Sequence, residues 1–111
     1  MNQPIWSPNP ETVGKTRVAQ LMESLGQPID PDRQEQSIRD FVRWSQQHPE
    51  QFWPGVFDDL GVVWTRPYDR VVDLTEGPEW ADWFPGGVTS IALNCVDVPA
   101  AENPNQLALV A

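Results

Sequence analysis

The chain has 111 residues and a formal net charge of −9, with 7 Lys and Arg against 16 Asp and Glu. This length suits one domain or part of one. So few basic residues argue against nucleic acid and anionic membranes as partners, because both need clustered Lys and Arg. No stretch approaches the roughly 18 apolar residues that span a bilayer, and the N-terminus lacks the features of a signal peptide. The single cysteine allows no internal disulfide, so we expect a cytoplasmic protein.

The first quarter of the chain predicts one helix. Asn9-Pro10-Glu11 has the residue types of a helix start, since Asn caps, Pro suits the first position and Glu favours the positive end of the dipole. Gly26 and Pro28 end the pattern. Between them, apolar residues follow at helical spacing, namely Val18, Leu21, Met22 and Leu25.

Two more helices are predicted after a polar connection over residues 27–36. Ser37-Ile-Arg-Asp40 is a capping-box pattern, and Ile38, Phe41 and Val42 form the apolar face behind it. That helix ends near Gln47 because His48 precedes a proline. The next helix runs from Pro49 to Leu60, with Gly61 closing it; Pro54 inside it weakens the pattern.

From Val62 onwards the pattern changes to short strands, predicted at residues 62–64 and 70–73, and then to a loop over residues 75–87. Thr89 or Ser90 caps a last helix, which Pro99 ends. Residues 107–110 read as a buried strand. A continuous apolar run usually belongs to a sheet that is covered on both faces, so the chain resembles the front part of a larger α/β protein. An uncovered edge there would favour self-association.

No residue lies in a recognisable catalytic motif. His48 is the only histidine and is favoured for capping or packing. Cys95 is predicted to be a small core hydrophobe, and with His48 alone it makes no zinc site. The acidic pairs lack calcium-loop spacing and are expected to be solvated; they are Asp58-Asp59, Asp69/Asp73 and Glu76/Glu79. We therefore predict no catalytic, cofactor-binding or metal-binding residue.

The region from Trp80 to Gly87 combines aromatic residues with a glycine pair. Gly86-Gly87 lacks both phosphate-loop patterns, so a tight backbone turn is favoured. Trp80, Trp83 and Phe84 could stack on a ligand or cover another domain. We favour a domain-docking surface, because large aromatics with few charges between them are typical of interface cores.

Several segments in order carry a family resemblance. They are FVRWSQQHPEQFW at 41–53, PYDRVVD at 67–73, WFPGG at 83–87, NCVD at 94–97 and the stretch 102–110. Together they resemble the N-terminal domain of the AMP-forming acetyl-CoA synthetase family and its short-chain acyl-CoA synthetase relatives. Trp6-Ser-Pro resembles the acetoacetyl-CoA synthetase type. Ser90 replaces the usual Asn, and Asp97-Val98-Pro99 replaces Asp-Arg-His, which leaves the acyl group open.

The resemblance implies an α+β fold, mainly α, with three to four short helices, a few short strands and long Pro- and Gly-rich loops, as an incomplete piece of a larger α/β enzyme. Residues 1–36 would be an extension with one helix, and residues 37–111 the synthetase-type N-terminal domain, ending at the first strand of the large domain. The parent enzyme would use ATP, Mg and CoA, none bound by this chain.

The resemblance also implies that the partner of this chain is the remaining large domain of the same enzyme. A further possibility is self-association through residues 107–110. Two alternatives stay open. The chain could be a stand-alone acidic interaction module that binds another protein through Trp83 and Phe84, or a small hydrolase that uses His48.

Overall fold

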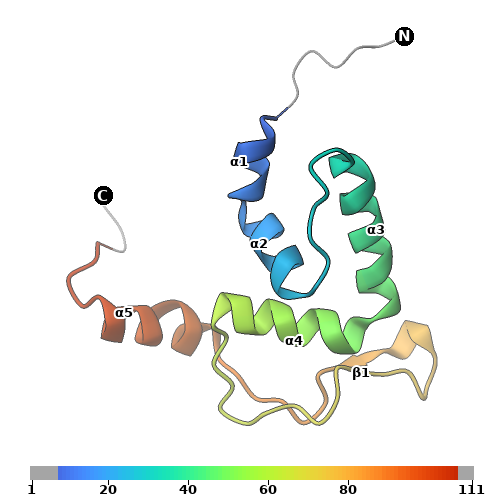
Figure 1. Ribbon diagram of the computed structural model, residues 1–111. Coiled ribbons are helices and arrows are strands. Elements are labelled where there is room, and N and C mark those ends of the chain that lie inside the picture. Colours follow the sequence, from blue (N-terminus) through green and yellow to red (C-terminus); the bar gives the residue numbers. More distant parts are fainter. Residues whose placement is uncertain (1–7, 108–111) are drawn as a thin grey trace. The chain divides into compact units, whose positions relative to one another are not determined.

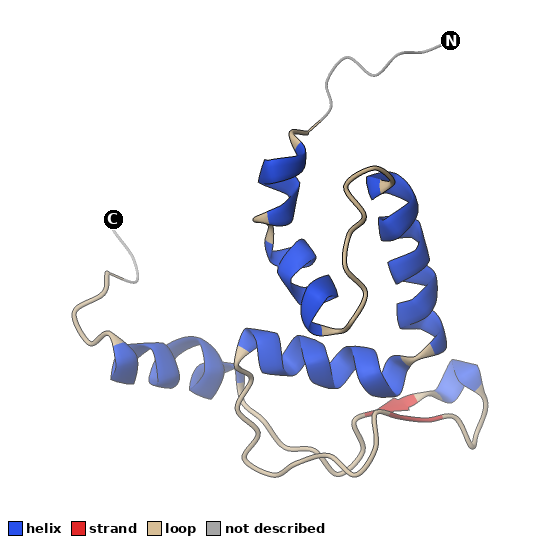
Figure 2. Cartoon of the chain, viewed as in Figure 1, coloured by secondary structure: helices blue, strands red, loops and turns tan. Residues whose placement is uncertain are grey.

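The computed structural model describes residues 8–107 (Figures 1 and 2). It has two compact units, which meet in sequence at Asp59 and Leu60. The first unit carries α1 (Pro10–Gly14), α2 (Arg17–Ser24), α3 (Gln34–Gln47) and α4 (Pro49–Leu60). The second carries β1 (Val72–Asp73), the 3₁₀ helix η1 (Pro78–Trp80), β2 (Asp82–Trp83), the π-helical segment η2 (Leu93–Asp97) and α5 (Val98–Glu102). A mainly helical chain with short strands is therefore confirmed.

The single helix predicted between Asn9 and Gly26 is two helices. Asn9 caps the first as expected, since its side chain accepts a hydrogen bond from the Glu11 N–H at 2.9 Å. The Thr16 hydroxyl then accepts from the Ala19 N–H at 3.2 Å and starts α2. A hydroxyl this close to free backbone donors competes with helix continuation. Gly26, at φ +72°, follows the end of α2 as predicted.

The predicted start of the next helix at Ser37 is wrong, because α3 begins at Gln34. The Ser37 hydroxyl donates to the Arg33 carbonyl at 3.1 Å and accepts from the Asp30 N–H at 3.1 Å. Ser37 therefore ties the first turn of α3 back to the preceding loop. The predicted end at Gln47 and the new start at Pro49 are both confirmed.

The core of the first unit is narrower than the apolar spacing predicts. Ala19, Met22 and Phe41 are buried, whereas Val18 is 52% exposed and Val42 is 50% exposed. A buried ring needs neighbours, and here the Phe41 ring meets that of Phe52 edge-on at 5.9 Å. Helix α2 thus buries two side chains and the longer α3 buries one.

Helix α4 continues through Pro54, although proline removes a hydrogen-bond donor inside a helix. Close packing accompanies this position, since a Cβ added to the next residue, Gly55, would collide with the Leu25 side chain. Arg17 of α2 also donates to Asp59 near the end of α4, to the carbonyl at 3.0 Å and to the carboxylate at 2.8 Å. Glycine at position 55 therefore lets α2 and α4 approach.

The described part of the second unit contains one antiparallel pair of strands, in which Val72 lies opposite Trp83 and Asp73 opposite Asp82. The prediction for 70–73 is partly confirmed, but β2 comes from the segment predicted as loop. The predicted strand at 62–64 is wrong, because that segment lies outside the ladder. Val71, next to β1, is 2% exposed and is the buried hydrophobic residue of this unit among those described.

The last helix does not end at Pro99. It runs from Ile91 to Glu102 and contains the π-helical turn Leu93–Asp97 just before that proline. A proline ring normally clashes with the carbonyl four residues earlier, and a wider π turn is one way in which a helix relieves such strain. Leu107 lies in no strand, and residues 108–110 of the predicted strand fall outside the described part. No helix within residues 8–107 is long and apolar enough to cross a membrane.

Candidate docking surface

A tight turn over Phe84–Gly87 organises the predicted surface. The Gly87 N–H donates to the Phe84 carbonyl at 3.0 Å. Pro85 occupies the second position and Gly86, at φ +78°, the third, which are the residue types of a type II turn. A Cβ on Gly86 would meet the Asp69 carboxylate, and a Cβ on Gly87 would lie 2.7 Å from the Trp64 ring. The glycine pair thus serves a turn, as predicted from sequence.

Three rings pack together at this turn. Phe84 lies 5.4 Å from Tyr68 and 6.0 Å from Trp64, and Trp64 meets Tyr68 edge-on at 5.1 Å, measured between ring centroids. Phe84 has a positive φ of 56°, which is uncommon for a non-glycine residue. The hydrogen bond from its N–H to the Val71 carbonyl, at 2.9 Å, holds it there. Phe84 is half-buried and anchors the turn.

The two tryptophans beside this cluster reach the surface. Trp80 ends η1 and is 74% exposed, and Trp83 in β2 is 49% exposed. The structure brings Trp83 next to Phe84, with ring centroids 5.9 Å apart. Exposed carboxylates flank the tryptophans at Glu79 and Asp82. The predicted set is therefore an anchor, Phe84, and two exposed rings with an acidic border.

Asn94 is a positioning residue whose role the sequence did not reveal. Its Oδ1 accepts from the Val63 N–H at 2.7 Å, and its Nδ2 donates to the Val63 carbonyl at 3.1 Å. Thr89 joins this group, since its hydroxyl donates to the same carbonyl at 2.7 Å. The main chains of Arg66 and Val88 also pair in an isolated bridge. These bonds hold the segment before Trp64 against the start of the last helix.

Asp73 carries the clearest electrostatic effect. Hydrogen bonds from the Thr75 hydroxyl and the Thr75 backbone N–H hold the pKa of the Asp73 carboxyl below its ordinary value of 3.8, and Arg70, 3.0 Å away, adds to the lowering. Desolvation of the carboxyl opposes these effects. The Asp73 carboxylate therefore stabilises the turn that follows β1 through its hydrogen bonds with Thr75.

His48 and Cys95 are the remaining candidate residues from the sequence. The His48 ring stacks on Trp44, with centroids 5.4 Å apart, and its Nδ1 lies 3.0 Å from the Trp44 carbonyl oxygen. The prediction that Cys95 is a core residue is wrong, because its side chain is exposed. Cys95 lies within the π turn of the last helix. Within residues 8–107, no group of three or more His, Cys, Asp or Glu is arranged to hold a metal ion.

The family described as "Acetyl-coenzyme A synthetase N-terminus" matches residues 38–95, just over half of the chain. The chain belongs to this family. The matched range contains the Phe84–Gly87 turn, its aromatic cluster and Asn94. The family resemblance drawn from the sequence is therefore confirmed.

Individual relatives are much longer. A hexanoyl-CoA synthase from Cannabis sativa is 28% identical over 116 residues, which cover 96% of this chain and 16% of the relative. A propionate–CoA ligase from Salmonella typhimurium is 33% identical over 75 residues, 68% of this chain and 12% of the ligase. A solved acetoacetyl-CoA synthetase from Streptomyces lividans superimposes with a TM-score of 0.74 at 26% identity, covering 96% of this chain and 16% of that one. The chain thus spans about a sixth or less of these relatives.

Proposed function

We propose that the chain is the non-catalytic N-terminal structural domain of an AMP-forming acyl-CoA synthetase. The observation that carries this is the family match over residues 38–95 in a chain that spans 16% of the acetoacetyl-CoA synthetase it resembles. The whole enzyme would join a short carboxylic acid to CoA, with ATP and Mg, through an acyl-adenylate. The match starting at residue 38 also supports a synthetase-type domain over 37–111 and an extension over 1–36.

In this proposal the exposed tryptophans dock on the remaining large domain. Trp80 and Trp83 together present large apolar rings to water, and tryptophan is enriched among residues that dominate interface energetics. Phe84 fixes their position through its contacts with Tyr68 and Trp64. Because Glu79 and Asp82 border the rings, the partner surface should be an apolar pocket edged by Lys or Arg.

The first experiment separates the roles of the chain and the large domain. The chain replaces the matching segment of the Streptomyces lividans acetoacetyl-CoA synthetase, giving a joined enzyme. With ATP, Mg, CoA and acetoacetate, the joined enzyme should form acyl-CoA. The isolated chain should release no pyrophosphate with either acetate or acetoacetate. Acyl-CoA formation by the isolated chain would overturn the structural role.

The second experiment tests the docking surface in trans. The chain is titrated against the Streptomyces enzyme that lacks its matching segment. Trp80→Ala and Trp83→Ala should each weaken binding by about 30-fold, since loss of an interface hot spot costs about 2 kcal/mol or more. Val18→Ala, which changes a 52% exposed residue of the first unit, is the control and should bind normally. Equal affinity of all variants would count against the tryptophan surface.

A stand-alone interaction module remains the competing outcome. Sequencing beyond the codon for Ala111 distinguishes the two: an open frame that continues into an ATP-binding loop supports the synthetase, and a stop codon supports the module. We also propose a cytoplasmic location, supported by the single cysteine. Fractionation of the native host checks it, and enrichment in an organelle would contradict it.

A further inference from the structure

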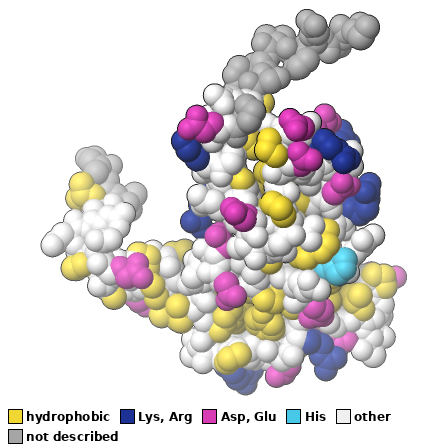
Figure 3. Space-filling model, viewed as in Figure 1, with side chains coloured by type: hydrophobic (Ala, Val, Ile, Leu, Met, Phe, Trp, Pro, Cys, Tyr) yellow, Lys and Arg dark blue, Asp and Glu magenta, His cyan; other side chains and the backbone are white. Residues whose placement is uncertain are grey.

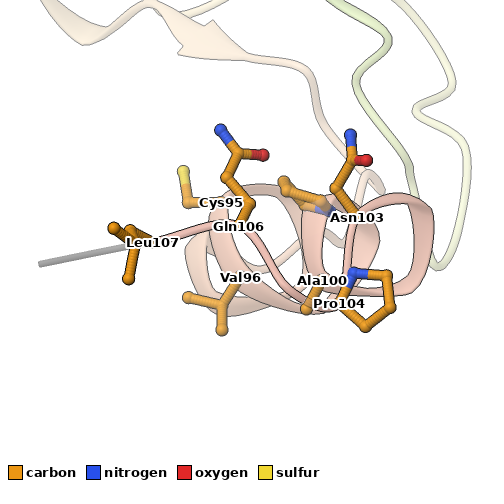
Figure 4. A pocket seen from close by; sticks show the side chains of 8 residues that line it. Cys95, Val96, Ala100, Asn103, Pro104, Gln106 and Leu107 are labelled. Atoms are coloured by element: carbon orange, nitrogen blue, oxygen red, sulfur yellow. The ribbon is translucent and has the colours of Figure 1, made fainter.

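The helix Ile91–Glu102 carries exposed apolar residues on its outer side, and Asp97 and Glu102 of the same helix are also exposed. Ile91 is 83% exposed and Val96 is 59% exposed, and Cys95 and Ala100 are exposed beside them. Cys95, Val96 and Ala100 line a shallow pocket of about 380 Å³ (Figure 4). Leu107, which is 80% exposed, lines the same pocket. The amides Asn103 and Gln106 also line this pocket, and no Asp, Glu, Lys or Arg does. Figure 3 shows hydrophobic side chains reaching the surface along this part of the chain.

The opposite face of the same helix is already engaged. Asn94 bonds to the backbone of Val63, and Leu93 and Val98 are half-buried. The helix therefore cannot rotate its apolar face inward without breaking the Asn94 hydrogen bonds. Exposed apolar patches often mark sites of interaction. We call the exposed residues Ile91, Cys95, Val96, Ala100 and Leu107 the outer helix face.

We propose that the outer helix face is a second docking surface, covered in the whole enzyme by the polypeptide that follows residue 107 in the longer relatives. This rests on the proposed function and adds a surface on a different element from Trp80 and Trp83. The relatives supply the occupant, because this chain spans only 16% of the synthetase it superimposes on.

Two physical arguments favour this occupant over a second copy. In the proposed whole enzyme, the polypeptide after residue 107 is tethered close to this helix, and a short connection gives a high effective concentration for docking. A second copy would bring together two chains that each carry a net charge of −9, and their repulsion opposes association. Because the residues of the outer helix face are uncharged, docking of the tethered polypeptide on this face avoids that electrostatic repulsion.

Cys95 offers a direct probe, since it is the only cysteine, is exposed and lies on the outer helix face. Its rate of alkylation by a maleimide is measured in the isolated chain and in the joined enzyme. Peptide-resolved mass spectrometry separates Cys95 from other cysteines. We expect labelling in the joined enzyme to be at least tenfold slower, and labelling of the isolated chain to be independent of its concentration.

A matched pair of variants tests the face itself. In the joined enzyme, Val96→Lys should restore fast labelling of Cys95, whereas Val42→Lys, at a similarly exposed valine of α3, should leave it slow. Thermal unfolding of the isolated chain shows whether either lysine disturbs the fold. If Val96→Lys disturbs the fold, the ratio of the wild-type labelling rates in the isolated chain and in the joined enzyme alone decides whether the outer helix face is covered.

The outcomes separate this inference from the proposed function. Equal labelling rates in the isolated chain and in an active joined enzyme would overturn the second docking surface and leave the proposed function standing. Protection that increases with the concentration of the isolated chain, with a doubled mass in light scattering, would assign the face to a second copy and also overturn it. A joined enzyme without acyl-CoA formation would count against the proposed function, and the same labelling ratio would still decide the inference.

Discussion

The side-chain amide of Asn94 pairs with the main chain of Val63 in both directions. Its Oδ1 accepts from the Val63 N–H at 2.7 Å, and its Nδ2 donates to the Val63 carbonyl at 3.1 Å, across 31 residues of sequence. A strand neighbour would satisfy the same two backbone groups. The amide therefore replaces a sheet partner for a segment that the sequence alone predicts to be a strand.

Removing this amide should destabilise the second unit. Asn94→Ala leaves the Val63 N–H and C=O without these bonds, so we expect a loss of about 1–2 kcal/mol in the free energy of unfolding. Urea unfolding followed by tryptophan fluorescence measures it. Asn105→Ala, in the exposed turn after the last helix, is the control and should change stability by less than about 0.5 kcal/mol. Equal stability of the two variants would contradict the role of Asn94.

The glycine pair gives a second prediction. A Cβ on Gly87 would lie 2.7 Å from the Trp64 ring and 3.0 Å from the Tyr68 Cβ, and overpacking of this kind costs about 1–3 kcal/mol. Gly87→Ala should therefore lower the melting temperature. Gly14→Ala is the matched control, because a Cβ there meets no atom within 4 Å at the end of α1. It should stabilise the chain by about 0.4–1 kcal/mol.

The pH dependence of stability should include a contribution from Asp73. Its folded-state pKa is held below 3.8, so the folded state favours the ionised carboxyl more than the unfolded state does. This stabilisation is present above pH 4 or so and is lost as the pH falls through the lower folded pKa. Asp73→Asn should reduce stability at neutral pH and lose less stability than wild type on acidification. Thr75→Val should reproduce part of this effect, and parallel pH profiles would contradict it.

His48 should act through packing. Its ring stacks on Trp44, and aromatic pairs contribute about 0.5–1.5 kcal/mol beyond their buried area. His48→Ala should lower the stability of the first unit by about 1 kcal/mol and change the tryptophan emission. Acyl-CoA formation by the joined enzyme should remain at the wild-type rate. A large fall in that rate without a change in stability would reopen a chemical role for His48.

Local signals predicted much of the first unit. Asn9, Gly26 and Pro49 lie at helix ends because capping, positive φ and missing N–H groups act within a few residues. The burial of each face was less predictable. Val18 fits the apolar spacing but is half-exposed, since burial depends on which neighbour a helix meets.

In the second unit, local sequence signals predicted less of the structure. The sequence by itself determined the turn at Phe84–Gly87, the absence of a catalytic motif and the family, because these depend on residue types in a short order. Only the tertiary structure decided that Val63 pairs with Asn94, that Asp82–Trp83 is a strand, and that Cys95 is exposed within a π turn. Each depends on groups far apart in sequence or on helix phase, and the spacing of apolar residues specifies neither.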